Sequence, residues 1–146
     1  MKVKRNTRIF FAFCLSLLFA GFASAQCTME SSFAPSNIDI PTRMETGQTA
    51  RVRVNVHNSG TCIWFGRDVK LEIKVIRKPT KAPYPLEEFK SELKLKNSVY
   101  PESTNTWYYE IKAPMYAGRY ELEWTMTNDD RPFGVQVRKT IEVNVP

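Results

Sequence analysis

The stretch that decides the fold is Ala113–Gly134, which reads APMYAGRYELEWTMTNDDRPFG. Large apolar residues alternate with polar ones within it, so that one face carries Tyr120, Leu122, Trp124 and Met126. A period of two is typical of a β-strand with one buried and one solvated face. The residues from Asn128 to Asp130 favour a turn. The stretch therefore predicts a strand, a turn and, from Phe133, the start of another strand.

Residues 1–25 have the three parts of a secretory signal peptide. A basic start precedes the apolar run from Ile9 to Phe22, which is too short to suit a membrane span, and Ala23-Ser24-Ala25 forms a small-residue cleavage site. The alternative is a retained N-terminal anchor. Cleavage would leave a single domain, residues 26–146, that is periplasmic or secreted and has no membrane span.

Removal of the signal peptide would also change the charge of the chain. The full sequence has 21 Lys and Arg against 15 Asp and Glu, a formal net charge of +6. Four of the basic residues lie in the signal peptide, so the mature chain would have a net charge of about +2. This small charge removes the main argument for nucleic-acid binding.

The cysteines fit the same interpretation. Cys14 lies in the signal peptide, and Cys27 and Cys62 remain as an even pair. In an oxidising compartment such a pair predicts a disulfide, and the alternative is two free thiols. Closing this loop would stabilise the fold by about 3–4 kcal/mol in the chain-entropy model.

Alternating segments recur through the rest of the chain. We expect strands at 37–41, Thr49–His57, Val69–Arg77, Ser91–Lys96, Thr106–Lys112 and Phe133–Val145. Lys139 interrupts the last apolar register, as a bulge or an exposed end would. Met44–Gln48 is expected as a turn, and a helical turn is the alternative for 86–90. About seven short strands with almost no helical periodicity predict an all-β fold, an immunoglobulin-like antiparallel β-sandwich.

The sequence shows no constellation typical of catalysis. His57 is the single histidine, so a zinc site would need carboxylates to complete it, and a nucleophilic serine would have no other base. A Gly-rich phosphate loop is absent. We therefore expect no enzymatic activity, no cofactor and no metal.

The aromatic residues are a better functional lead. Four of them fall in inward registers and are expected in the core: Trp107, Tyr109, Tyr120 and Trp124. Tyr108 faces the opposite way from Trp107, and Tyr84 and Tyr116 fall in expected loops. These three tyrosines are the candidate interface, for a protein or for a sugar that stacks on their rings. Aromatic residues that merely cover strand ends are the alternative.

Two motifs occur in an order and spacing that match a known family. The first is Asn58-Ser59-Gly60-Thr61-Cys62-Ile63-Trp64, and the second comprises Ala113-Pro114, Gly118, Tyr120, Trp124 and Phe133-Gly134. Together they resemble the four-tryptophan (FW) immunoglobulin-like domain, over residues 41–145. Two of the family's tryptophans are missing, near Asn55 and Arg138, and Trp107 is additional.

The resemblance implies a β-sandwich that serves as a protein-interaction module and has no enzymatic activity of its own. It implies no particular partner. We therefore expect an exported module that binds another protein. The alternative is a carbohydrate- or cell-wall-binding module that uses exposed aromatic side chains.

Overall fold

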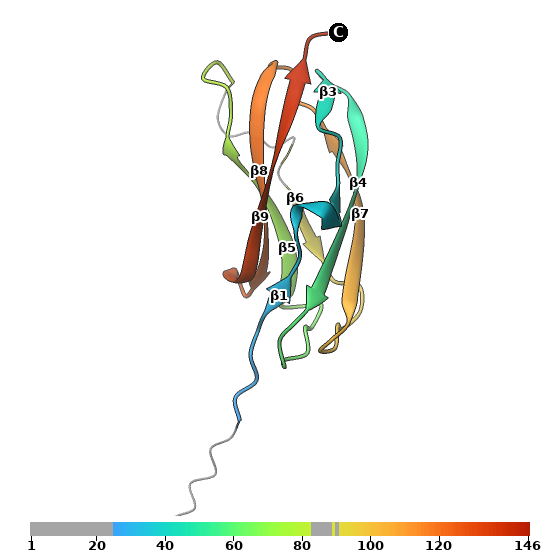
Figure 1. The fold of residues 1–146 in the computed structure, drawn as a ribbon, viewed down its shortest axis with the longest axis vertical. Helices are drawn as coiled ribbons and strands as arrows, with labels where there is room; N and C mark the ends of the chain where they lie inside the picture. The colour runs from blue at the N-terminus through green and yellow to red at the C-terminus, as the bar shows by residue number, and fades with distance from the viewer. Residues whose placement is uncertain (1–24, 83–88, 90) are drawn as a thin grey trace, which may run out of the picture.

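The structure is a computed structural model that describes residues 25–82, 89 and 91–146. Two β-sheets pack face to face, and the described termini lie at opposite ends of the molecule (Figure 1). The expected all-β, immunoglobulin-like sandwich is confirmed. The signal peptide, Tyr84 and most of the segment 86–90 lie outside the described residues.

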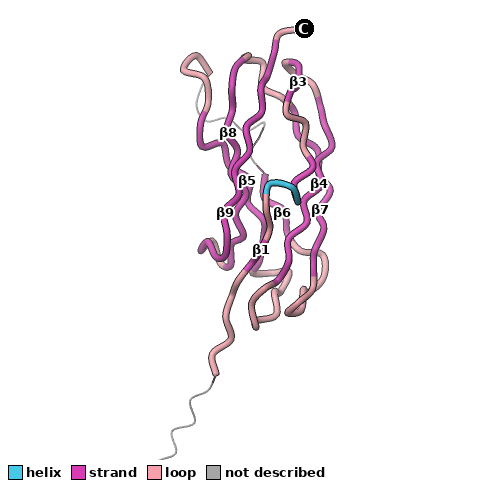
Figure 2. Tube along the Cα trace, in the orientation of Figure 1, coloured by secondary structure: helices cyan, strands magenta, loops and turns pink. Residues whose placement is uncertain are grey.

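The smaller sheet is centred on β4. It comprises β1 (Ser31–Ser32), β2 (Ile38–Asp39), β4 (Thr49–Asn58) and β7 (Thr104–Lys112). β1 and β2 pair with one side of β4 at different heights, and β7 pairs with the other side. The 3-10 helix η1 (Pro35–Asn37), cyan in Figure 2, joins β1 to β2. The expected strand at 37–41 therefore shortens to two residues.

The larger sheet has the order β3-β9-β8-β5-β6. Its strands are β3 (Arg43–Glu45), β5 (Val69–Arg77), β6 (Ser91–Lys94), β8 (Gly118–Asn128) and β9 (Arg131–Asn144). Its pairs are antiparallel except that β3 runs parallel to β9. The chain therefore changes sheet between β2 and β3. Its N-terminal part contributes β1 and β2 to the smaller sheet and β3 to the larger one.

The expected turn at Met44–Gln48 was wrong in its first half. Arg43–Glu45 forms β3, with Met44 buried between two exposed neighbours. Such a three-residue alternation is too short to be distinguished from a turn by periodicity. What makes it a strand is the parallel pairing of Met44 with Val143 at the far end of the chain.

The irregularity in β9 lies at Gly134-Val135 and not at Lys139. Thr125 pairs with Gln136 but Met126 pairs with Phe133, so two residues of β9 have no partner. Gly134 has φ +67°, where a side chain would be strained and would collide with Ser31. This bulge shifts the register, which is why Val135 is exposed.

Lys139 instead stays in register, opposite Leu122. Its ammonium group donates hydrogen bonds to the carbonyl oxygens of Pro35 (3.2 Å) and Ile38 (2.7 Å), across the gap between the sheets. The lysine therefore binds the η1 segment. Val145, the last residue of the expected strand, lies beyond the end of β9 and is exposed.

Three of the four aromatic residues that the alternation placed inward are buried in the core, and the fourth, Tyr109, is partly buried against it. Trp64, Tyr120 and Trp124 are fully buried, and Trp107 is 7% exposed. The rings of Trp64 and Phe133 pack edge to face with their centroids 5.6 Å apart. The rings of Tyr120 and Phe89 pack in the same way with centroids 5.3 Å apart. Val52, Val54 and Val56 of β4 form the opposite wall of this cluster.

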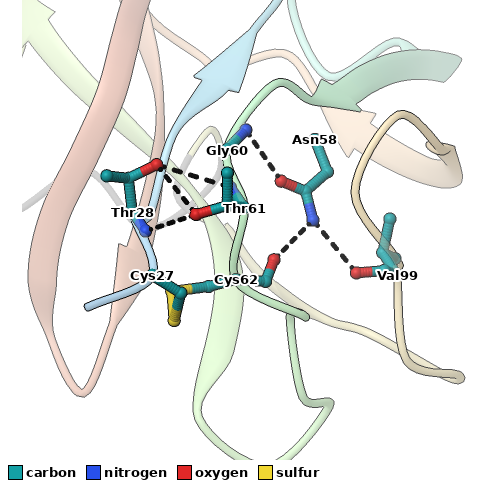
Figure 3. The surroundings of a disulfide bond; sticks show 7 residues. All are labelled: Cys27, Thr28, Asn58, Gly60, Thr61, Cys62 and Val99. Atoms are coloured by element: carbon teal, nitrogen blue, oxygen red, sulfur yellow. Dashed lines mark hydrogen bonds between the residues drawn. A yellow bond between two sulfur atoms is a disulfide. The ribbon is translucent and has the colours of Figure 1, made fainter. Parts of the chain in front are cut away.

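The disulfide between Cys27 and Cys62 is confirmed (Figure 3). Beside it, the buried Asn58 amide donates to the carbonyl oxygens of Cys62 (2.9 Å) and Val99 (3.1 Å), and its oxygen accepts from the Gly60 N–H (3.1 Å). A Cβ at Gly60 would collide with the Thr28 carbonyl, so only glycine lets the N-terminal segment cross here. The Asn-Ser-Gly-Thr-Cys motif thus anchors the N-terminal segment.

We expect the double substitution Cys27→Ser and Cys62→Ser to lower the free energy of unfolding by about 3–4 kcal/mol, because the unfolded chain regains the entropy of a 35-residue separation. Urea denaturation of both proteins measures this difference. Wild-type protein in dithiothreitol is the control and should unfold at the urea concentration of the variant. Equal stability of the oxidised protein and the variant would contradict the prediction.

Candidate binding surface

β7 carries the most exposed tyrosine of the described residues. Trp107 and Ile111 point into the core, and Tyr108 and Glu110 point outward. The Tyr108 side chain is 63% exposed and lies across from Arg53 of β4. The expected orientation of Tyr108, opposite to that of Trp107, is confirmed.

A hydrogen bond from Trp107 ties β7 to the larger sheet. The indole Nε1 donates to the carbonyl oxygen of Lys94 at 3.1 Å. Lys94 is the last residue of β6, so this bond spans the gap between the edges of the two sheets. Tyr108 therefore projects from a strand that is held on its inner side by a buried indole.

A second indole holds the same strand to β8. Trp124 Nε1 donates to the hydroxyl of Tyr109 at 2.9 Å. Burial raises the pKa of this phenol well above its usual range, and the hydrogen bond from Trp124 offsets only part of that effect. Tyr109 is therefore a neutral bridge between the two sheets.

A groove of about 250 Å³ lies beside Tyr108, between β7 and the end of β6. Lys94, Lys96 and Asn97 line one side of it, and Asn105 to Tyr108 line the other. None of its lining residues is acidic, and neither lysine forms an ion pair with any described residue. The groove therefore combines uncompensated positive charge with amide groups and aromatic surface.

The outer face of the larger sheet is charged as well, but its charges are paired. Lys70 contacts Asp130 at 2.7 Å and Glu92 at 3.2 Å, which raises the pKa of Lys70 and lowers that of Asp130. Arg138 contacts Glu123 at 2.8 Å. Arg77 lies 3.6 Å from Glu121, so both glutamates on this face of β8 pair with an arginine.

The two described tyrosines of the candidate interface, Tyr108 and Tyr116, lie in different parts of the molecule. Tyr116 is 46% exposed in the turn after β7, where its carbonyl oxygen accepts from the Tyr120 hydroxyl at 2.6 Å. Tyr108 lies four residues before the end of β7, about 13 Å at the rise of a strand. Tyr84 lies outside the described residues.

The residues of the two sequence motifs are mainly structural. Gly60, Gly118 and Gly134 lie where a side chain would collide with Thr28, Pro79 and Ser31 respectively. The others are buried or partly buried: Asn58, Trp64, Pro114, Tyr120, Trp124 and Phe133. The motifs therefore account for the sandwich and leave the binding surface to other residues.

His57 lies on the polar face of β4. Its Nδ1 is 3.3 Å from the Thr104 hydroxyl, and its Nε2 is 3.5 Å from a carboxylate oxygen of Glu102, which is exposed. Within the described part of the chain, no group of three or more His, Cys, Asp or Glu could hold a metal ion.

A wider groove of about 510 Å³ lies beside the disulfide and was not anticipated from the sequence. Met29, Ile63 and Phe65 supply apolar surface there, and Asp129 lies at its margin. These residues come from three separate segments, so no local pattern could reveal the groove. For the groove at Tyr108 a signal existed, because Lys94 and Lys96 alternate with leucines.

Comparison with known proteins supports the fold. No family model matches the sequence, and no curated protein matches it. The chain is similar to two structures of a CARDB domain from Pyrococcus furiosus, with TM-scores of 0.54 and 0.53 at 12% identity. The matches cover 82% of this chain and 97% and 96% of those domains. One of those structures is described as a complex with di-metal ions.

A likeness at this identity shows the fold alone. The metal ions belong to the Pyrococcus domain, and the resemblance to the FW domain stays a prediction. Among the residues that the structure describes, no helix is long and apolar enough to cross a membrane.

We expect Tyr109→Phe to lower the free energy of unfolding at pH 7 by about 1–3 kcal/mol, because the Trp124 N–H would then be buried without an acceptor. The substitution should also make the free energy of unfolding fall less steeply as the pH rises above about 10. The raised pKa of Tyr109 keeps it protonated in the folded state, so its contribution is complete below the unfolded pKa of about 10 and is lost as pH rises above it.

Urea denaturation between pH 7 and pH 12 measures both effects. Tyr108→Phe is the matched control, since it removes an exposed hydroxyl from the neighbouring residue and should leave the stability at pH 7 unchanged. Lys70, whose pKa is also raised, gives all three proteins the same further alkaline loss. Parallel alkaline curves for wild type and Tyr109→Phe would show that this phenol is not protected by folding.

Proposed function

We propose that this chain is a non-enzymatic exported module that binds another protein in the cell envelope or outside the cell, with the outer surface around Tyr108 as its binding surface. The observation that carries the proposal is the exposed Tyr108 ring beside an unneutralised basic groove, on a strand held by two buried indoles. Tyrosine supplies a large contact area with a polar tip, and it is enriched at interfaces.

Rigidity supports this use. Trp107 and Trp124 hold β7 to β6 and β8, so Tyr108 needs little ordering when a partner binds. Less conformational entropy is then lost on association. The paired charges on the outer face of the larger sheet make that face a weaker candidate, because a partner would have to displace existing ion pairs.

Export is supported by the disulfide, since such bonds persist in oxidising compartments. A binding role is favoured over catalysis by the surroundings of His57, whose ring lies at an exposed strand end with Thr104 and Glu102 as its neighbours. The predicted FW resemblance implies the same class of function.

Carbohydrate binding is a second candidate, and one observation favours it. Asn97 and Asn105 line the groove next to the Tyr108 ring. Amide groups beside an aromatic face suit a sugar, because the amides bond hydroxyl groups and the ring stacks on the pyranose. The experiment below separates this candidate from protein binding.

Affinity capture from an envelope extract, on immobilised oxidised protein, tests the proposal. We expect a specific protein partner whose retention falls by about tenfold or more for Tyr108→Ala, as for an interface anchor. Tyr116→Ala is the control, because that tyrosine is exposed elsewhere, and it should retain the partner. Retention on peptidoglycan or polysaccharide without any protein partner would favour the second candidate and overturn the first.

A further inference from the structure

The register between β4 and β7 shows which backbone groups of β7 do not bond β4. Ala113 N–H donates to the Gln48 carbonyl at one end of the ladder, and Asn58 N–H donates to the Ser103 carbonyl at the other. Between these ends the pairing is continuous, with no bulge. Hydrogen-bonded and non-bonded pairs alternate in an antiparallel ladder. The odd-numbered residues of β7 therefore bond β4, and the even-numbered ones turn their N–H and C=O groups away from it.

These groups form a row along the edge of the smaller sheet that faces away from β4. They belong to Thr104, Thr106, Tyr108, Glu110 and Lys112, whose side chains are exposed. No described residue pairs with this edge of β7. An unpaired row of alternating donors and acceptors on a regular strand is a template for another strand.

The other sheet edges are protected by their shortness. β6 has four residues, β3 has three, and β1 and β2 have two each. Pro41 follows soon after β2 and lacks an N–H. β7 has nine residues and contains neither a proline nor a bulge against β4. It therefore lacks three of the devices that protect edge strands, which are shortness, a proline and a bulge.

The groove beside Tyr108 indicates the chemistry of an added strand. It lies at Asn105 to Tyr108, next to the N–H and C=O groups of Thr106 and Tyr108 that turn away from β4, and has a volume of about 250 Å³. Lys94 and Lys96 line it without an acidic neighbour in the groove. Charge complementarity therefore favours a carboxylate.

We propose that the free edge of β7 takes up an extended segment of the partner protein as an additional strand, and that the groove at Lys94, Lys96 and Tyr108 receives an acidic side chain of that segment. This inference rests on the proposed function as a protein-binding module. Main-chain hydrogen bonds to the even-numbered residues supply affinity, and the groove supplies specificity.

Synthetic peptides test the proposal directly. The probe is a blocked seven-residue peptide of alternating valine and threonine with a central glutamate, and the matched control has a central lysine. Isothermal titration should give an affinity about tenfold or more higher for the glutamate peptide. In the double variant Lys94→Glu and Lys96→Glu, the preference should reverse.

Hydrogen exchange identifies the edge. Saturation with the glutamate peptide should slow exchange at the amides of Thr106, Tyr108 and Glu110. The amides of Trp107 and Ile111 already bond β4 and should be unchanged. Protection that does not alternate in this way would contradict strand addition.

Substitution of Glu110 provides the matched pair of variants. Glu110→Pro removes a free N–H without touching the β4 ladder or the groove, and should lower peptide affinity by about tenfold or more. Glu110→Ala keeps the N–H and should bind as wild type does. Thermal unfolding of both variants confirms that they are folded.

Three results would overturn the inference. They are equal affinity for the two peptides, no binding up to millimolar concentration, and concentration-dependent protection of the same amides without peptide, which would identify a second copy as the occupant. Affinity capture from the extract distinguishes failure of this inference from failure of the proposed function. A partner retained by Glu110→Pro would leave protein binding intact and remove the β7 edge from it.

Discussion

Two indole hydrogen bonds hold β7 in place, and the surface that we assign to binding depends on them. β7 pairs with β4 alone among the described strands, so its other edge gains no support from a neighbour. Trp124 bonds the Tyr109 hydroxyl and Trp107 bonds the Lys94 carbonyl, and both bonds reach the larger sheet. Each indole is buried, where an unpaired N–H would be destabilising by about 1–3 kcal/mol. The strand therefore remains fixed while its edge stays open.

Elsewhere on the sandwich, many polar and charged groups are already bonded to one another. At one end, the disulfide ties the N-terminal segment to the β4–β5 connection, and the Asn58 amide bonds the Cys62 carbonyl of that connection. Lys139 of β9 reaches across to the η1 segment and bonds its carbonyl oxygens. On the outer face of the larger sheet, cross-strand ion pairs satisfy the charges. Beside Tyr108, in contrast, backbone groups of β7 that do not bond β4 lie next to two lysines without an ion pair among the described residues.

An open edge has consequences for the molecule as a whole. A regular nine-residue strand without proline invites self-pairing as well as partner binding. Lys112 and Glu110 stand on the exposed row and add charge to it, which is one of the ordinary protections against edge-to-edge association. An unpaired edge of this length is explained if a partner strand binds to it. The basic groove beside the edge favours a partner strand with an acidic side chain.

Alternation of apolar and polar residues was enough to place Trp124 and Tyr120 in the core and Tyr108 outside it, because the side-chain period of a strand is a local property. The even pair of cysteines and the expected export were enough to predict the Cys27–Cys62 bond. Partner strands are not local: Arg43–Glu45 is a strand only because β9 lies beside it, and the bulge at Gly134 exists only against β8. The same holds for the binding surface. Whether a strand is an edge depends on the order of strands in the sheet, and the groove forms only where β6 of one sheet meets β7 of the other, which long-range packing decides.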